Sequence, residues 1–125
     1  MIIGTGIDII EIDRIKRIIK KWNYHFLNKV YTLDEIYYCK QRKEGCFQSF
    51  TGYFAAKEAW AKAIGTGIYG IKWKEIEIRK EMSGKPYIHL SGQAKIMATK
   101  RKINNTNLSI THNRQWAIAQ VIIES

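Results

Sequence analysis

The chain has 125 residues and a formal net charge of +10, from 21 Lys and Arg against 11 Asp and Glu. Its length suits one domain with a buried core, and no run of about 18 apolar residues offers a membrane-spanning helix. The excess positive charge favours a polyanionic partner, such as a nucleic acid, an anionic lipid, a phosphorylated cofactor or an acidic protein. A solubilising surface without such a partner is the alternative.

The first half of the chain predicts one strand followed by helices. Residues 1–9 are apolar and β-branched, as in a strand. Residues 11–21 place isoleucines at helical spacing among basic residues, which predicts an amphipathic helix with a basic outer face. Thr32 and Glu35 have the spacing of a capping box, so another helix is expected to begin there. Residues 47–64 form the longest expected helix, which ends where glycine follows.

The second half predicts mainly strands. Residues 73–80 alternate apolar and charged side chains, as half-buried strands do. A turn leads to a short strand at 86–90, and Ser91 is expected to cap a short basic helix. Residues 108–111 and 116–123 are expected to form a closing pair of strands. This order predicts the α+β class, with a mainly antiparallel sheet and helices packed on one face.

The whole chain, residues 1–125, is expected to be one cytoplasmic domain. No Pro-, Gly- or Ser-rich linker divides it. Cys39 and Cys46 lack the spacing of a zinc site, so we expect reduced thiols. The apolar N-terminal segment contains Asp8 and has no basic leader, which is not typical of a signal peptide.

Two carboxylates are candidates for chemistry. Asp8 interrupts an apolar strand, where a charge is costly unless it is paired or binds a metal. Asp8 could instead end the strand and cap the next helix. Glu58, Lys62 and Gly65 share one stripe of the long helix, although a Glu58–Lys62 pair is also common on helix surfaces. Because Mg²⁺ prefers oxygen ligands and lysine neutralises phosphate, the set suits a magnesium–pyrophosphate site.

The surroundings of this stripe set two further expectations. Lys62 and Gly65 lie toward the helix C-terminus, where the helix dipole disfavours anions. The lysine and the metal ion must therefore supply the attraction for a bound phosphate group. Ala55 and Ala61 flank the stripe and are expected to leave room for a ligand.

Two motifs extend these observations. Residues 6–14 read GIDIIEIDR and fit the pattern G-x-D-x-x-x-x-x-R, and residues 54–67 read FAAKEAWAKAIGTG and fit F-x-x-K-E-A-x-x-K-A-x-G-x-G. A Gly-Lys-Pro turn at 84–86 and the segment SITH at 109–112 also fit. In these features the chain resembles the small holo-[acyl-carrier-protein] synthases, the short trimeric class of 4'-phosphopantetheinyl transferases. The resemblance covers essentially the whole chain.

The resemblance implies a reaction. A serine of apo acyl carrier protein attacks the β-phosphate of coenzyme A, receives the 4'-phosphopantetheine group and releases 3',5'-ADP, in support of fatty acid biosynthesis. It also implies that Asp8 and Glu58 bind Mg²⁺ and, with Lys62, form the catalytic group. Glu58 is then the general base, directly or through a metal-bound water, and Lys62 contacts the phosphates.

The resemblance further implies residues that bind coenzyme A. These are Lys62, Gly65, His112 and Lys85. For His112, a structural hydrogen-bonding role is the alternative, although a basic donor suits a phosphate.

Partners follow from the charge and from the resemblance. Acyl carrier proteins are acidic, so their carboxylates are expected to meet the basic helix; a solvated helix face is the alternative for any one of these side chains. Its candidate contacts are Arg14, Arg17, Lys20 and Lys21. The family implies a homotrimer with active sites between protomers. A basic nucleic-acid-binding module is the alternative function, but it leaves Asp8 and Glu58 unexplained, and the chain lacks the signatures of such modules. We therefore expect no nucleic acid as a partner. Since no long apolar run is present, we expect no membrane as a partner either.

Overall fold

The computed structural model describes residues 1–125, in which one strand is followed by a run of helices, a pair of strands, a short helix and a final pair of strands. No helix is long and apolar enough to cross a membrane. The elements, in chain order, are β1 (Ile2–Glu11), α1 (Ile12–Trp22), α2 (Tyr24–Val30), α3 (Leu33–Gln41), η1 (Lys43–Gly45), α4 (Cys46–Ile64), η2 (Trp73–Glu75), β2 (Ile76–Lys80), β3 (Pro86–Leu90), α5 (Gly92–Lys100), β4 (Asn105–His112) and β5 (Trp116–Glu124).

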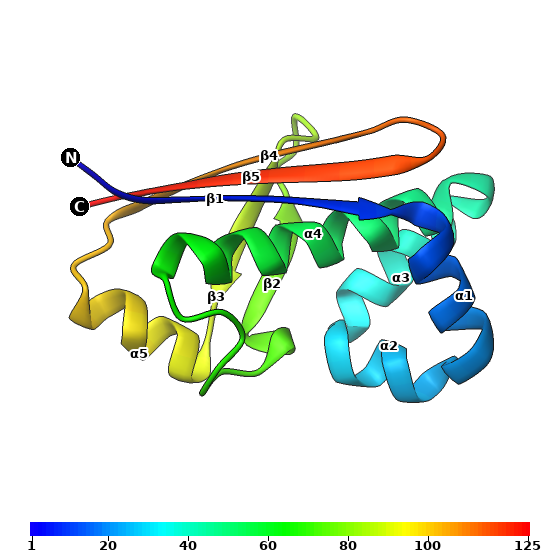
Figure 1. Cartoon of the computed structure of the whole chain (residues 1–125), viewed down its shortest axis with the longest axis horizontal. Coiled ribbons are helices and arrows are strands. Elements are labelled where there is room, and N and C mark those ends of the chain that lie inside the picture. The colour runs from blue at the N-terminus through cyan, green and yellow to red at the C-terminus, as the bar shows by residue number, and fades with distance from the viewer.

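A three-stranded antiparallel sheet forms one layer, and α4 runs along one of its faces (Figure 1). The strand order is β1-β5-β4, so β1 and β4 are the two edges. Asp8 on β1 lies opposite Ala119 of β5, and His112 on β4 lies opposite Ala117. Strands β2 and β3 form a separate antiparallel hairpin. The predicted α+β class is confirmed, with the strands divided between two sheets.

Strand β1 approaches α4 unusually closely, and two glycines make this possible. A Cβ atom on Gly6 would overlap the carbonyl oxygen of Ala59, and one on Gly4 would overlap that of Ala63. The main chains of the strand and the helix therefore touch at these points. Asp8 follows two residues after Gly6 on the same side of the strand, so it is held beside α4.

A single apolar cluster joins the layers. It contains 25 buried residues contributed by helices and strands throughout the chain. Trp60 and Ile64 of α4 lie within it. Gly65 ends α4 with a left-handed φ of 92°, which confirms the expected stop.

The capping box is confirmed, whereas another predicted cap is not. Thr32 Oγ1 accepts from the Glu35 N–H at 3.2 Å, and Glu35 Oε1 accepts from the Thr32 N–H at 2.8 Å. Ser91 stands at the N-cap of α5, but its side chain makes no capping bond. Glu75 Oε2 accepts from the Gln93 N–H at 3.1 Å in its place.

The strand predicted over residues 73–80 begins later than expected. Its first three residues form η2, because Glu75 Oε1 accepts from the Lys72 N–H at 2.9 Å and holds a tight turn. The strand proper starts at Ile76. Helix α2 was not predicted from the sequence.

Candidate functional site

Asp8 and Lys62 meet between β1 and α4. Lys62 Nζ donates to Asp8 Oδ1 at 2.9 Å and to the carbonyl oxygen of Ile7 at 3.1 Å. The Asp8 side chain is only 15% exposed. Strand β1 continues to Glu11, and helix α1 has no side-chain cap, so the reading of Asp8 as a strand-ending cap is wrong. Lys62 pairs with Asp8 across the fold, and no Glu58–Lys62 ion pair forms.

Glu58 lies one helical turn before Lys62 and is half-buried. Burial, and next the negative charge of Asp8, raise the pKa of Glu58, whereas Lys62 and Arg14 act in the opposite direction. Asp8 and Glu58 therefore lie close enough for their charges to repel. The fold thus brings together two carboxylates that are 50 residues apart in the sequence.

The donor set of these two side chains fits Mg²⁺. Magnesium is bound by oxygen ligands and takes one or two carboxylates in many phosphate-handling sites. Asp8 and Glu58 belong to no larger cluster of His, Cys, Asp and Glu. Phosphate oxygens and water would therefore complete the octahedron around an ion held here.

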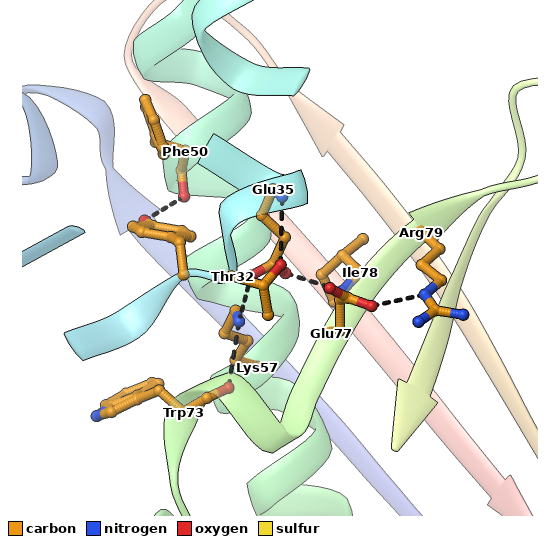
Figure 2. Close-up of polar contacts among 9 residues, drawn as sticks. Thr32, Glu35, Phe50, Lys57, Trp73, Glu77, Ile78 and Arg79 are labelled. Carbon is orange, nitrogen blue, oxygen red and sulfur yellow. Dashed lines mark hydrogen bonds and ion pairs between the residues drawn. The ribbon is translucent and has the colours of Figure 1, made fainter. Parts of the chain in front are cut away.

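A buried ion pair anchors α4 to α3 and to the segment before β2 (Figure 2). Lys57 Nζ donates to Glu35 Oε1 at 2.8 Å and to the Trp73 carbonyl oxygen at 3.2 Å. Glu35 Oε2 accepts from the Ile78 N–H at 2.8 Å. Lys57 and Glu35 are both fully buried. Because neighbouring helical residues point about 100° apart, anchoring Lys57 sets the direction of Glu58.

His112 lies at the end of edge strand β4 and is exposed. Its imidazole takes part in no hydrogen bond within the chain, so the structural hydrogen-bonding role is not observed. His112 lines a pocket of about 280 Å³, together with Arg42, Lys80 and Gly52. Three basic side chains around one hollow suit a phosphate-bearing ligand.

The His112 pocket and the carboxylate pair lie apart within one chain. Asp8 is on β1 and His112 is on β4, with β5 between them. Two strand spacings separate the edges by about 10 Å. Lys85 lines a different pocket, of about 400 Å³, with Asn105 and Asn107. The structure therefore joins Asp8, Glu58 and Lys62, but does not bring His112 or Lys85 to them.

The basic face of α1 is exposed, and its first residue, Arg14, lies near Glu58. Its members Arg14, Arg17, Lys20 and Lys21 all lie at the surface. Arg17 is 3.9 Å from Glu11, and Arg14 lies close enough to Glu58 for its charge to lower the pKa of that residue. The surface assigned to an acidic partner is thus continuous with the candidate metal site.

One sequence expectation about this site is wrong, and three residues were missed. Ala55 and Ala61 are fully buried, so the space beside them is filled by the protein's own packing. Arg42 and Lys80 were not predicted because they come from distant segments, and no local pattern links them with His112. Arg101, which contacts the end of α4, was missed for the same reason.

Comparisons with known proteins cover the whole chain. A family profile described as "4'-phosphopantetheinyl transferase superfamily" matches residues 4–121. The holo-[acyl-carrier-protein] synthase of Halothermothrix orenii is 46% identical over 124 residues, which cover 99% of this chain and 98% of that protein.

Solved structures share the fold. The crystal structure of holo-[acyl-carrier-protein] synthase from Neisseria meningitidis matches with a TM-score of 0.92 and 32% identity, covering 100% of both chains. The Helicobacter pylori holo-[acyl-carrier-protein] synthase in complex with coenzyme A matches with a TM-score of 0.85 and 34% identity, covering 96% of this chain and 99% of that one.

Proposed function

Since the chain belongs to the 4'-phosphopantetheinyl transferase superfamily and is a transferase, we propose that it transfers 4'-phosphopantetheine from coenzyme A to a serine of apo acyl carrier protein. The products are holo acyl carrier protein and 3',5'-ADP, and the reaction supports fatty acid biosynthesis. Residues 1–125 act as one transferase domain. The observation that carries the proposal is the meeting of Asp8, Glu58 and Lys62 within the family's two motifs. We do not propose the nucleic-acid-binding alternative, because the family match accounts for these residues.

Asp8 and Glu58 hold Mg²⁺ in this proposal. When bound, the ion neutralises and polarises the pyrophosphate. Lys62 binds phosphate oxygens and stabilises the charge that develops on the leaving group. The contact between Lys62 and Asp8, at 2.9 Å, supports this role because it keeps the ammonium group beside a carboxylate that would hold the metal ion.

Glu58 accepts the proton of the attacking serine, directly or through a water molecule. A general base works best when its pKa is near the operating pH. Burial and the charge of Asp8 move the pKa of Glu58 upward, in that direction. The carboxylate is half-buried, so it can still be reached from the basic face of α1, where the carrier protein docks.

We further propose that the enzyme is a homotrimer and that coenzyme A lies between neighbouring protomers. Gly65 and Lys62 of one protomer contact the coenzyme, and His112 and Lys85 contribute from the next. The proposal is supported by the separation of the His112 pocket from Asp8 within one chain. It is also supported by the sheet face opposite α4, where Ile7 is 59% and Ile9 is 56% exposed. A second copy of the chain would bury these apolar side chains.

The acyl carrier protein docks on α1. Its acidic recognition surface faces Arg14, Arg17, Lys20 and Lys21, which steer association and respond to salt. Arg14 lies close enough to Glu58 for its charge to lower the pKa of that residue. A carrier protein docked on Arg14 would therefore have its target serine near the general base.

Mass spectrometry of apo acyl carrier protein tests the function. The carrier is incubated with coenzyme A, Mg²⁺ and the purified protein, with a known synthase in parallel. We expect the carrier to gain one phosphopantetheine group and 3',5'-ADP to form in equal amount, and we expect EDTA to stop both. An unmodified carrier, in samples where the known synthase works, rejects the proposal.

A further inference from the structure

A basic side chain from a later segment of the chain, Arg101, contacts the C-terminal end of α4. Arg101 follows α5, and its Nη1 donates to the carbonyl oxygen of Ile64, the last residue of α4. The same Nη1 lies 3.9 Å from the position that a Cβ atom on Gly65 would occupy. The guanidinium therefore stands beside Gly65, at the end of the stripe that contains Glu58 and Lys62.

Helix α5 packs against η2 and the loop that follows α4, which places it close to this end of α4. Figure 1 shows α5 beneath the end of α4 that leads into the following loop. Ala94 and Ala98 of α5 are buried in the apolar cluster, and Thr66 Oγ1 lies 3.9 Å from the Met97 sulfur. The Arg101 N–H donates to the Met97 carbonyl oxygen at 3.2 Å, which ends α5. Arg101 is thus presented to α4 by a packed helix.

The charge of Arg101 is not neutralised within the chain. It takes part in none of the ion pairs. A guanidinium has five N–H donors in a planar fork, and the contact with Ile64 uses one nitrogen. The remaining donors can bind an oxyanion in the bidentate manner that phosphates favour.

Arg101 also counteracts the unfavourable electrostatic potential that an anion would meet at this end of α4. The C-terminal end of a helix carries partial negative charge and disfavours anions. Lys62 lies in this last turn and is already paired with Asp8. A second cation at the same end offsets the dipole where a phosphate would approach Gly65.

We propose that Arg101 binds a phosphate group of the nucleotide half of coenzyme A, beside Gly65 at the C-terminal end of α4. The inference rests on the proposed function and adds a residue to it. In this proposal the Arg101 guanidinium has two roles. One N–H group donates to the Ile64 carbonyl oxygen, and the other N–H groups donate to phosphate oxygens. The competing reading is that Arg101 only caps α4.

Calorimetric titration with 3',5'-ADP separates the two readings. The proteins are the wild type, Arg101→Gln, Arg101→Lys and the matched control Lys100→Gln, which removes a neighbouring exposed cation with no side-chain bond of its own. Glutamine retains an N–H donor for Ile64. We expect Arg101→Gln to weaken binding by about tenfold or more, as for the loss of a charge-assisted hydrogen bond. Lys100→Gln should change it less than about twofold, and Arg101→Lys should recover part of the loss.

The outcomes are distinguishable. If Arg101→Gln binds 3',5'-ADP as the Lys100→Gln control does and alters only thermal stability, Arg101 is a cap and the inference is overturned. The wild-type transfer assay is run on the same samples. Transfer by the wild type, with unchanged nucleotide binding by Arg101→Gln, rejects the role of Arg101 and leaves the proposed function standing. A wild type that neither transfers the group nor binds 3',5'-ADP rejects both.

Discussion

Glu58 is held where its ionised form is unfavourable. Burial is the main cause of its raised pKa, and the neighbouring charge of Asp8 is the second. Its folded pKa lies above its ordinary value of 4.5. The neutral carboxyl therefore favours the folded state below that ordinary value, and this contribution is lost as the pH rises through the folded pKa. Without a metal ion, the charged Glu58 costs stability at neutral pH.

Replacing Glu58 should therefore separate stability from activity. In the absence of Mg²⁺, we expect Glu58→Gln to melt at a higher temperature than the wild type at pH 7.5, whereas at about pH 4 the difference should shrink because the wild-type carboxyl is then largely protonated. Turnover should fall by about 10²- to 10⁴-fold, as for the loss of a general base. Melting curves at both pH values and transfer rates at pH 7.5 check this.

Glu44→Gln, at an exposed position in η1, is the matched control and should change neither quantity appreciably. Normal turnover by Glu58→Gln would show that Glu58 is neither an essential ligand nor the base. An equal gain in stability at both pH values would show that charge is not the cause.

At the scale of elements, one ion pair connects α3, α4, η2 and β2. Glu35 accepts from the Ile78 N–H and from Lys57, which also reaches the Trp73 carbonyl oxygen. Burial raises the pKa of Glu35 and lowers that of Lys57, while the attraction between the two opposes both effects. Removing one partner leaves the other buried and uncompensated.

Lys57→Met should destabilise the protein by about 3–5 kcal/mol, because the Glu35 carboxylate loses its counter-charge. The double variant Lys57→Met/Glu35→Gln should recover part of that loss, since an amide oxygen can still accept the Ile78 N–H without a buried charge. Urea unfolding measures both. Lys29→Met, which removes an exposed lysine, is the control. A loss for Lys57→Met as small as that for Lys29→Met would show that the pair does not anchor α4.

The sequence predicted those elements whose signals are local. The helix α4 and the Thr32 cap depend on spacing within a few residues, and both formed as expected. Helix α2 depends on tertiary packing, with Leu27 buried and the ring centroid of Phe26 6.1 Å from that of Phe54 on α4. Similarly, η2 depends on a carboxylate that also binds the N-terminus of α5. Such long-range contacts leave no periodic trace in the sequence.

The candidate site was predictable in part for the same reason. Asp8 was noticeable as a charge in an apolar strand, and the stripe of Glu58 and Lys62 followed from helical spacing. Their meeting depends on how β1 crosses α4, which no local pattern specifies. Arg101 and Arg42 reach their positions from segments without a distinctive motif, so their types alone did not mark them.

At the scale of the molecule, the two faces of the sheet differ. One face is covered by α4, and the other presents exposed isoleucines of β1 beside the half-buried Ile118 and Ile122 of β5. The basic residues of α1 lie at a different surface. A trimer formed through the apolar face would leave the basic helix free for a carrier protein.

Ile7→Lys should disrupt the proposed trimer, because it places a charge in an interface that would otherwise bury an apolar side chain. Light scattering during size-exclusion chromatography should give a mass near three times 14.6 kDa for the wild type and near 14.6 kDa for the variant. Transfer activity should fall with the trimer. The control Tyr69→Lys changes an exposed aromatic residue outside the sheet. A monomeric wild type, or an unchanged mass for Ile7→Lys, contradicts the prediction.

The contact of Gly4 and Gly6 with α4 has a consequence for how the site can vary. The spacing between Asp8 and Glu58 is set by two main chains in direct touch, and not by the volume of any side chain between them. Exchanges among the isoleucines and alanines of the core can therefore change the stability of the protein while the spacing stays the same. A single methyl group on Gly6, in contrast, would push strand and helix apart. The distance between the strand and the helix that carry the carboxylates thus depends most directly on two positions that have no side chain at all.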